Sequence, residues 1–141
     1  MSEIRIREEI RSPPNKVWAV LTEPTLYPKL FPGVQAVRRT SGQRWGLSLE
    51  WEEEQDLPWH HGLARGTVTS WVDFRQFGVN YRFLDPSLES MDLSYSLKAQ
   101  ENGTAVQLKA VHPFFAQEEN LTSSEQVLGA FLGNIKTSLK R

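Results

Sequence analysis

Three histidines and one glutamate are the residues of this chain whose types and spacing could carry acid–base chemistry. His60 and His61 are adjacent, His112 ends the last expected strand, and Glu53 lies on the apolar parity of a strand just before the histidine pair. Imidazole exchanges a proton near neutral pH, and a nearby carboxyl group can share that work. These four are the candidate catalytic residues. The alternative is that the adjacent histidines simply face water, since they do not easily point the same way.

Most other chemistries lack their residues. The chain has no cysteine, which excludes disulfides, thiolate nucleophiles and cysteine-ligated metals. The histidines do not have the spacing of metal-binding motifs, and no phosphate-binding glycine loop or dinucleotide fingerprint is present. We therefore expect no metal and no cofactor. A net charge of −1 with dispersed basic residues argues against nucleic acid as a partner.

Composition and the first residues bound the class of protein. The 141 residues, 39% hydrophobic and 23% charged, fit one globular domain, which we place at 1–141. The N-terminus is charged and has no apolar signal core. No apolar run approaches the roughly 20 residues that span a bilayer. We expect a cytoplasmic protein with no integral membrane segment, as a monomer or homodimer.

Alternating apolar and polar residues predict the strands that must position the candidate groups. In one strand Trp45, Leu47, Leu49 and Trp51 share the inward parity, which Glu53 and Gln55 continue, and a loop at 56–62 then carries two of the histidines. Glu8 lies on the isoleucine face of the first strand, as either a buried carboxylate or an edge residue. The expected elements are a strand at 4–11, short helices at 13–21 and 25–30, strands at 34–40, 45–54, 64–74, 79–83, 91–98 and 106–112, and an amphipathic helix at 123–139.

This order of elements predicts an α+β architecture. A sheet built from hairpins has to curl to cover its apolar face, and the last helix is the only large element left to cover it. A curled sheet around one helix leaves a hollow, which suits a small-molecule pocket. A further alternative is that Trp51, Phe131 and their neighbours fill this interior completely.

Three segments of the sequence form a familiar set: IRSPPNKVW at 10–18, LFPGV at 30–34 and the Asn102-Gly103-Thr104 turn. They resemble the corresponding segments of the START-like (SRPBCC) superfamily, which includes polyketide cyclases, coenzyme-Q-binding domains, Hsp90-activator-like domains and plant pathogenesis-related allergens. The resemblance implies a helix-grip fold, with a seven-stranded curved antiparallel sheet wrapped around a long C-terminal helix. Its element order is strand, two helices, six strands, helix. It also implies a pocket mouth formed by loops at 56–63, 85–90 and 113–121.

We expect the chain to bind a hydrophobic or amphipathic small molecule, such as a lipid, polyketide or isoprenoid-like compound, between the sheet and the last helix. One alternative is a polyketide cyclase, aromatase or dehydrase-type enzyme that orients its substrate and uses the acid–base groups. Another is an Hsp90-activator-like interaction module. The expected ligand-binding residues are those of inward parity: Leu49, Trp51, Val68, Ser70, Val72, Tyr81, Phe83, Leu93, Tyr95, Leu108, His112, Phe131 and Ile135.

Overall fold

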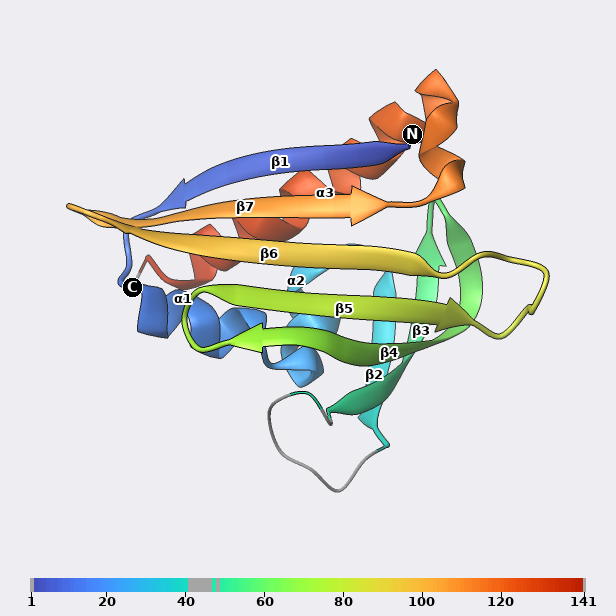
Figure 1. The fold of residues 1–141 in the computed structure, drawn as a ribbon, viewed down its shortest axis with the longest axis horizontal. Coiled ribbons are helices and arrows are strands. Elements are labelled where there is room, and N and C mark those ends of the chain that lie inside the picture. The colour runs from blue at the N-terminus through green and yellow to red at the C-terminus, as the bar shows by residue number, and fades with distance from the viewer. Residues whose placement is uncertain (1, 41–46, 48, 141) are drawn as a thin grey trace.

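The computed structural model describes residues 2–40, 47 and 49–140, in which seven strands form one antiparallel sheet (Figure 1). The sheet order is β1-β7-β6-β5-β4-β3-β2, so the last strand lies beside the first. The strands are β1 (Glu3–Ile10), β2 (Val34–Arg39), β3 (Glu50–Leu57), β4 (His60–Val72), β5 (Gln76–Phe83), β6 (Met91–Gln100) and β7 (Gly103–Val111).

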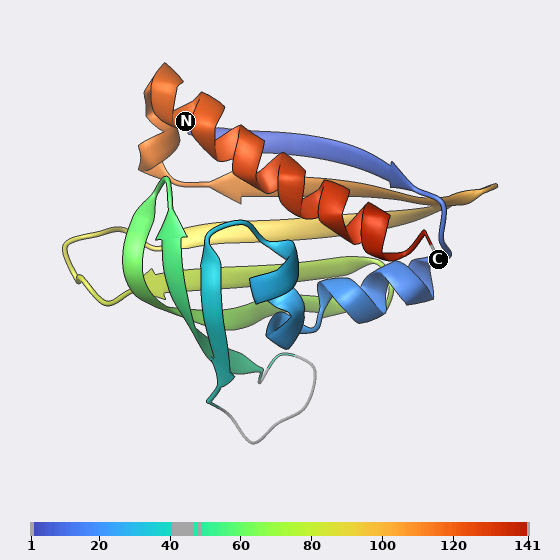
Figure 2. The same ribbon diagram turned by 180° about the vertical axis from the view of Figure 1, so that it is seen from behind.

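The helices lie together on one side of the sheet, and the last one crosses it diagonally (Figure 2). They are α1 (Pro14–Leu21), η1 (Pro24–Leu26), α2 (Tyr27–Leu30), η2 (Pro113–Ala116) and α3 (Glu118–Ser138). Each of the helices α1, η1, α2 and η2 has a proline at its first or second residue. The backbone N–H has no partner within the helix at these positions, so its absence costs no hydrogen bond. The predicted helix-grip fold is confirmed. Among the described residues, none of the helices is long and apolar enough to cross a membrane.

The helix α3 begins five residues before its predicted start at 123. Glu118 and Glu119 lie in its first turn, where negative charge is favoured by the helix dipole. Near its other end, Lys136 Nζ lies 3.4 Å from Glu8 Oε2 on β1. Glu8 is therefore half-buried and paired, rather than an isolated carboxylate in the interior.

The predicted loop at 56–62 is mostly strand. The chain reverses within Pro58 and Trp59, so β4 starts at His60, which is the register partner of Leu57. Because side chains alternate along a strand, His60 is buried and His61 is exposed. The start of β3 is also later than predicted. Leu47 lies in a turn and is 62% exposed, and Trp45 lies outside the described residues.

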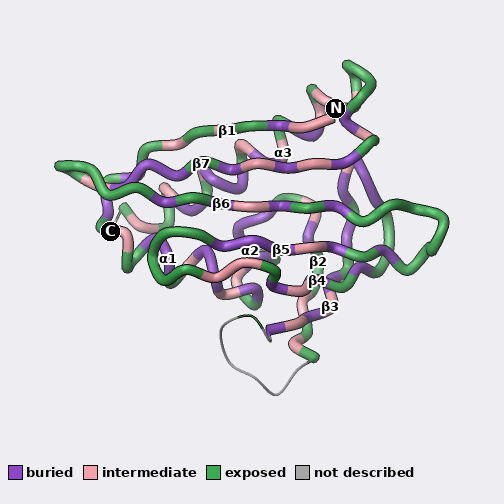
Figure 3. The backbone as a smooth tube through the Cα atoms, viewed as in Figure 1, coloured by how far each residue is buried: buried purple, intermediate pink, exposed green. Residues whose placement is uncertain are grey.

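A β-bulge in β4 places two of the predicted pocket residues on the outer face of the sheet. The register with β5 shifts between Val68 and Ser70, so one extra residue reverses the parity of the rest of the strand. Trp71 packs inward against Trp18, whereas Ser70 pairs with Gly78 on the outer face and Val72 is 47% exposed. The predicted inward positions of Ser70 and Val72 are wrong. Figure 3 shows the alternation of buried and exposed residues along the strands.

The indole of Trp51 lies across the backbone of β4 at its register partner, Gly66. A Cβ atom at Gly66 would lie 2.6 Å from Trp51 Cε2, closer than two carbon atoms that are not bonded to each other can approach. Trp51 is fully buried and makes an edge contact with Tyr81 on β5. The glycine therefore fixes the depth at which the indole lies in the interior.

We predict that Gly66→Ala lowers the free energy of unfolding by about 1–3 kcal/mol, because the added methyl group must displace the Trp51 indole. The control is Gly129→Ala in α3, where a Cβ meets no atom within 4 Å. That change should raise the free energy of unfolding by roughly 0.5–1 kcal/mol, because alanine favours the helix. Urea denaturation followed by circular dichroism measures both, and equal stabilities for the two variants would contradict the packing described.

Candidate functional site

The inner face of β3 carries a row of polar atoms in an otherwise apolar interior. Strict alternation places Trp51, Glu53, Gln55 and Leu57 on this face, and all four are buried. Glu53 is 1% exposed and Gln55 is 4% exposed. The expected inward position of Glu53 is confirmed by its burial, and the row is the candidate site.

Three donors converge on the Glu53 carboxyl group. Trp51 Nε1 donates to Oε1 over 2.9 Å, and Gln55 Nε2 donates to Oε2 over 2.8 Å. The hydroxyl group of Tyr81, across β4 on β5, is a further hydrogen-bond partner. A buried carboxyl group without such partners would cost several kcal/mol, so these bonds make its position tolerable.

Burial nevertheless dominates the titration of this group. Removal from water raises the pKa of Glu53 above its ordinary value of 4.5, although the bonds from Gln55, Trp51 and Tyr81 act in the opposite direction. Burial, with the nearby Glu53 carboxylate as a further cause, also raises the pKa of Tyr81 and Tyr95 well above 10. The interior thus favours the neutral form of every one of these groups.

Gln55 links the buried carboxyl group to His60. Because the Gln55 amide nitrogen donates to Glu53, its oxygen is left to accept from His60 Nδ1–H, at 2.9 Å. Burial lowers the pKa of His60 below 6.5, and the neighbouring His61 adds to this effect. A neutral His60 with its proton on Nδ1 has a lone pair on Nε2, and among the described residues none donates a hydrogen bond to that atom.

The β3–β4 turn meets η2 at one end of the molecule (Figure 2), and His60, which begins β4 after this turn, contacts an aromatic ring there. The His60 ring lies 4.3 Å from the ring of Phe83, which lies 5.9 Å from that of His112. Trp59, in the turn, contacts Phe115 of η2 at a centroid distance of 6.1 Å. We call Trp59, His60, Phe83, His112 and Phe115 the aromatic rim. The rim contains residues of two of the segments that the resemblance implied as the pocket mouth, 56–63 and 113–121, and the third, 85–90, is joined to it by the bond between His112 and Glu89.

His112 holds the backbone of the rim in place. Its Nδ1 accepts from the N–H of Phe114 over 3.0 Å, and its Nε2 donates to the carbonyl oxygen of Glu89 over 2.9 Å. Both ring nitrogens are therefore engaged by backbone groups, one in η2 and one in the β5–β6 loop. This arrangement suits a positioning role better than the predicted acid–base role.

The structure separates His61 from the other candidates. Its side chain lies on the outer face, where Nδ1 is 2.6 Å from Asp56 Oδ1, and both groups are largely exposed. Within the part of the chain that the structure describes, no three His, Asp or Glu side chains are grouped as metal ligands would be.

The middle of the interior is filled by rings. The Phe131 ring stacks on Phe31 at 4.5 Å and makes edge contacts with Tyr27 and Tyr95. The remaining predicted wall residues are all buried, namely Leu49, Trp51, Val68, Tyr81, Phe83, Leu93, Tyr95, Leu108, His112, Phe131 and Ile135. Their burial agrees with an inward position, and ligand contact by them stays a prediction.

Two buried polar atoms, one in the aromatic rim and one on α3, were not predicted from the sequence. Trp59 Nε1 and Ser124 Oγ are buried and have no hydrogen-bond partner among the described residues. Ser124 lies seven residues before Phe131, which is two turns and about 10 Å along the same face of α3. Ser124 lies inside the helix predicted at 123–139, one turn before the buried Leu128, so following the apolar stripe of this helix one turn further back could have revealed it.

The stability of the protein should report the burial of Glu53. Below about pH 4.5 the group is protonated in both states; above it the unfolded chain loses the proton that the folded chain keeps. Stability therefore falls as pH rises from 4.5 towards the folded pKa, and is constant beyond it. We predict that the free energy of unfolding falls relative to that of Glu53→Gln over this range, as measured by urea denaturation at several pH values.

The control is Glu54→Gln on the exposed face of the same strand. This variant should follow the wild-type pH dependence, because it keeps the buried carboxyl group. A constant stability difference between wild type and Glu53→Gln across the range would contradict the raised pKa.

Comparison with known proteins places this geometry in a family. The family model described as polyketide cyclase / dehydrase and lipid transport matches residues 1–140. The comparison with curated proteins found no match.

Solved structures share the fold at low sequence identity. Zhui aromatase/cyclase from Streptomyces sp. R1128 has a TM-score of 0.77 at 14% identity, over 96% of this chain and 92% of that one. Protein NE0264 from Nitrosomonas europaea has 0.75 at 19%, over 99% and 94%. The Aha1 dimer from Colwellia psychrerythraea has 0.72 at 18%, over 99% and 97%. With the family match over nearly the whole chain, the START-like resemblance is confirmed, and the chain belongs to the polyketide cyclase / dehydrase and lipid transport family.

Proposed function

We propose that this protein binds a hydrophobic or amphipathic small molecule between the sheet and α3, at the end closed by the aromatic rim. The observation that carries the proposal is the polar row of Glu53, Gln55 and His60, which is held inside an aromatic interior and leads to that rim. Such a row costs stability, and a few polar groups among apolar walls are what a ligand site needs. The family match supports the same reading.

The rim end favours binding over the middle of the interior. Around Phe131 the rings are in direct contact, so a ligand there would have to displace several of them. Trp59 Nε1 in the rim and Ser124 Oγ on α3, between η2 and Phe131 in the chain, are donors without a partner among the described residues, which is a loss of free energy that a bound acceptor would recover. A ligand with an apolar body and a carbonyl or hydroxyl group has the matching chemistry.

Entry requires a movement of the rim. Trp59 rests against Phe31 and Phe115, and it occupies a two-residue turn between long strands. A swing of this side chain would open the interior without breaking a side-chain hydrogen bond among the described residues, because Nε1 makes none. Trp59 is thus the gate in this proposal.

Cyclase or dehydrase chemistry is the second candidate function. It is favoured by the same row, since a buried carboxyl group with a raised pKa can give up a proton and His60 Nε2 can accept one. In that case Glu53→Gln should abolish turnover of a poly-β-keto substrate and leave its binding unchanged. In a pure carrier, the same variant has no turnover to lose.

Native mass spectrometry of the freshly purified protein, repeated after denaturing extraction, tests the proposal. We expect an added mass in the native spectrum that is lost on denaturation and is recovered as an apolar compound. A chain that carries no added mass, and that also fails to enhance the fluorescence of anilinonaphthalene sulfonate, would contradict ligand binding in the interior.

Ser124 should separate stability from binding. We predict that Ser124→Ala raises the free energy of unfolding by about 1 kcal/mol, because it removes a buried hydroxyl group without a partner. The same change should weaken binding of the extracted compound, as measured by calorimetry.

The matched control is Ser123→Ala, which removes a hydroxyl group already bonded to the carbonyl oxygen of Asn120. It should leave binding unchanged. If Ser124→Ala stabilises the chain and binding stays at the wild-type level, Ser124 is a packing feature and not part of the site.

A further inference from the structure

A shallow hollow of about 360 Å³ lies on the outer face of β4 and β5, on the side of the sheet away from α3. Its floor is the backbone around Ala64 and Phe83, whose side chains point inward. Its corners are four outward side chains of the two strands, Leu63, Arg65, Arg82 and Leu84.

The register sets these four side chains in two facing pairs. Arg65 and Arg82 are direct partners, and the N–H of Leu84 donates to the carbonyl oxygen of Leu63 over 3.1 Å. Residues two apart along a strand lie about 7 Å from one another on the same face. The hollow is therefore cationic at one end and apolar at the other, with about 7 Å between the two.

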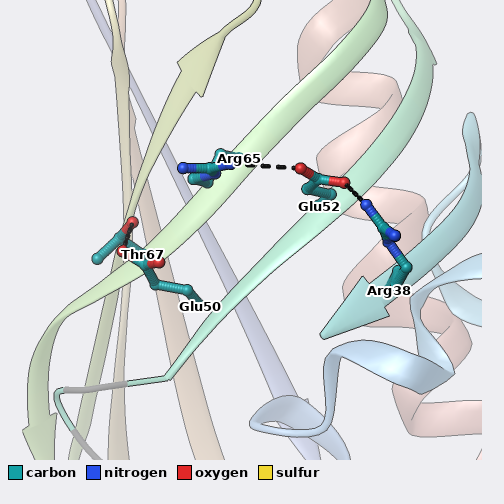
Figure 4. A network of polar contacts seen from close by, with 5 residues as sticks. All are labelled: Arg38, Glu50, Glu52, Arg65 and Thr67. Carbon is teal, nitrogen blue, oxygen red and sulfur yellow. Dashed lines mark hydrogen bonds and ion pairs between the residues drawn. The ribbon is translucent and has the colours of Figure 1, made fainter. Parts of the chain in front are cut away.

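The cationic end has fewer carboxylates than guanidinium groups. Glu52 accepts from Arg38 and also from Arg65 Nη2, the latter over 3.3 Å, and these two bonds lower the pKa of Glu52 (Figure 4). Arg82 makes no ion pair or hydrogen bond with any described residue. Like charges directly opposite one another on a sheet are unfavourable, so this pair would be relieved by an anion.

The apolar end is also incompletely covered. Leu84 is 74% exposed and Leu63 is 38% exposed, so two large apolar side chains face solvent beside the arginine pair. A hollow this shallow encloses little of a small molecule, whereas arginine beside apolar groups is typical of protein interfaces. Glu54, the register partner of Leu63, and Asp56 are exposed on the adjacent strand. A broad anionic surface such as a membrane would meet these carboxylates as well as the arginines, whereas a single carboxylate can lie beside the arginine pair alone.

We propose that this hollow binds an extended, acidic segment of a partner protein. An extended segment that runs along the strands presents alternate side chains about 7 Å apart, which is the spacing of the two ends of the hollow. The matching segment has an acidic residue, any residue, then a large apolar residue. Its carboxylate meets Arg65 and Arg82, and its apolar side chain lies between Leu63 and Leu84.

The test is fluorescence anisotropy with a labelled peptide in which glutamate and leucine alternate with threonine. We expect saturable binding that weakens at least about tenfold in Arg82→Glu. The matched control is Arg75→Glu in the β4–β5 turn, which makes the same charge change away from the hollow and should bind like wild type. Resonance shifts in an amide NMR titration should map to residues 63–65 and 82–84.

Four results would overturn the proposal. Equal weakening in both arginine variants would mean that the peptide responds only to overall charge. Equal binding of a peptide with lysine in place of glutamate would remove the role of the arginine pair. Binding of free benzoate as tightly as the peptide, or binding of anionic phospholipid vesicles that depends on Arg82, would make the hollow a site for a different class of ligand.

Discussion

The burial of one carboxyl group, that of Glu53, is the constraint on which the rest of this interior depends. Desolvation disfavours its charged form, and three hydrogen-bond donors, rather than a cation, stabilise the group in the interior. Each donor imposes a further condition. The Trp51 indole reaches the carboxyl group only because Gly66 has no side chain, and Tyr81 reaches it from the strand beyond. Local sequence, sheet register and electrostatics thus meet at one residue.

The same arrangement connects the interior to its entrance. Gln55 has one donor group and one acceptor oxygen, so its bond to Glu53 decides the tautomer of His60. The His60 ring in turn contacts that of Phe83, and His112 bonds to the backbone of η2 and of the β5–β6 loop. Hydrogen bonds of Gln55 and His112 therefore hold the residues of the rim in position. Trp59 Nε1 and Ser124 Oγ remain without a hydrogen-bond partner among the described residues, and our proposal assigns both atoms to the ligand.

Much of this fold could be predicted from the sequence, because alternation and element order carry most of the information. The alternation from Leu49 to Gln55 is sufficient to predict that Glu53 faces the interior, where the structure has it. The bulge after Val68 could not be predicted, because one extra residue in a strand costs little free energy and no particular residue type marks it. The bulge turns the side chains of Ser70 and Val72 from the inner face of the sheet to the outer face. The segment at 56–62 was predicted as a loop, and His60 and His61 were expected to point in different directions. The structure makes most of this segment strand, and the alternation of side chains along β4 is what separates the two histidines. The hydrogen bond from His112 Nε2 to the carbonyl oxygen of Glu89 joins segments 23 residues apart, which no local sequence pattern indicates.

The titration of Glu53 itself tests the account most directly. In a protein labelled with carbon-13 at the glutamate carboxyl positions, the signal absent from Glu53→Gln identifies this residue. We predict that it keeps the chemical shift of a protonated carboxyl group when the exposed glutamates have already titrated near pH 4.5. A signal that titrates together with those of the exposed glutamates would show that the interior does not hold a neutral acid, and would contradict the account.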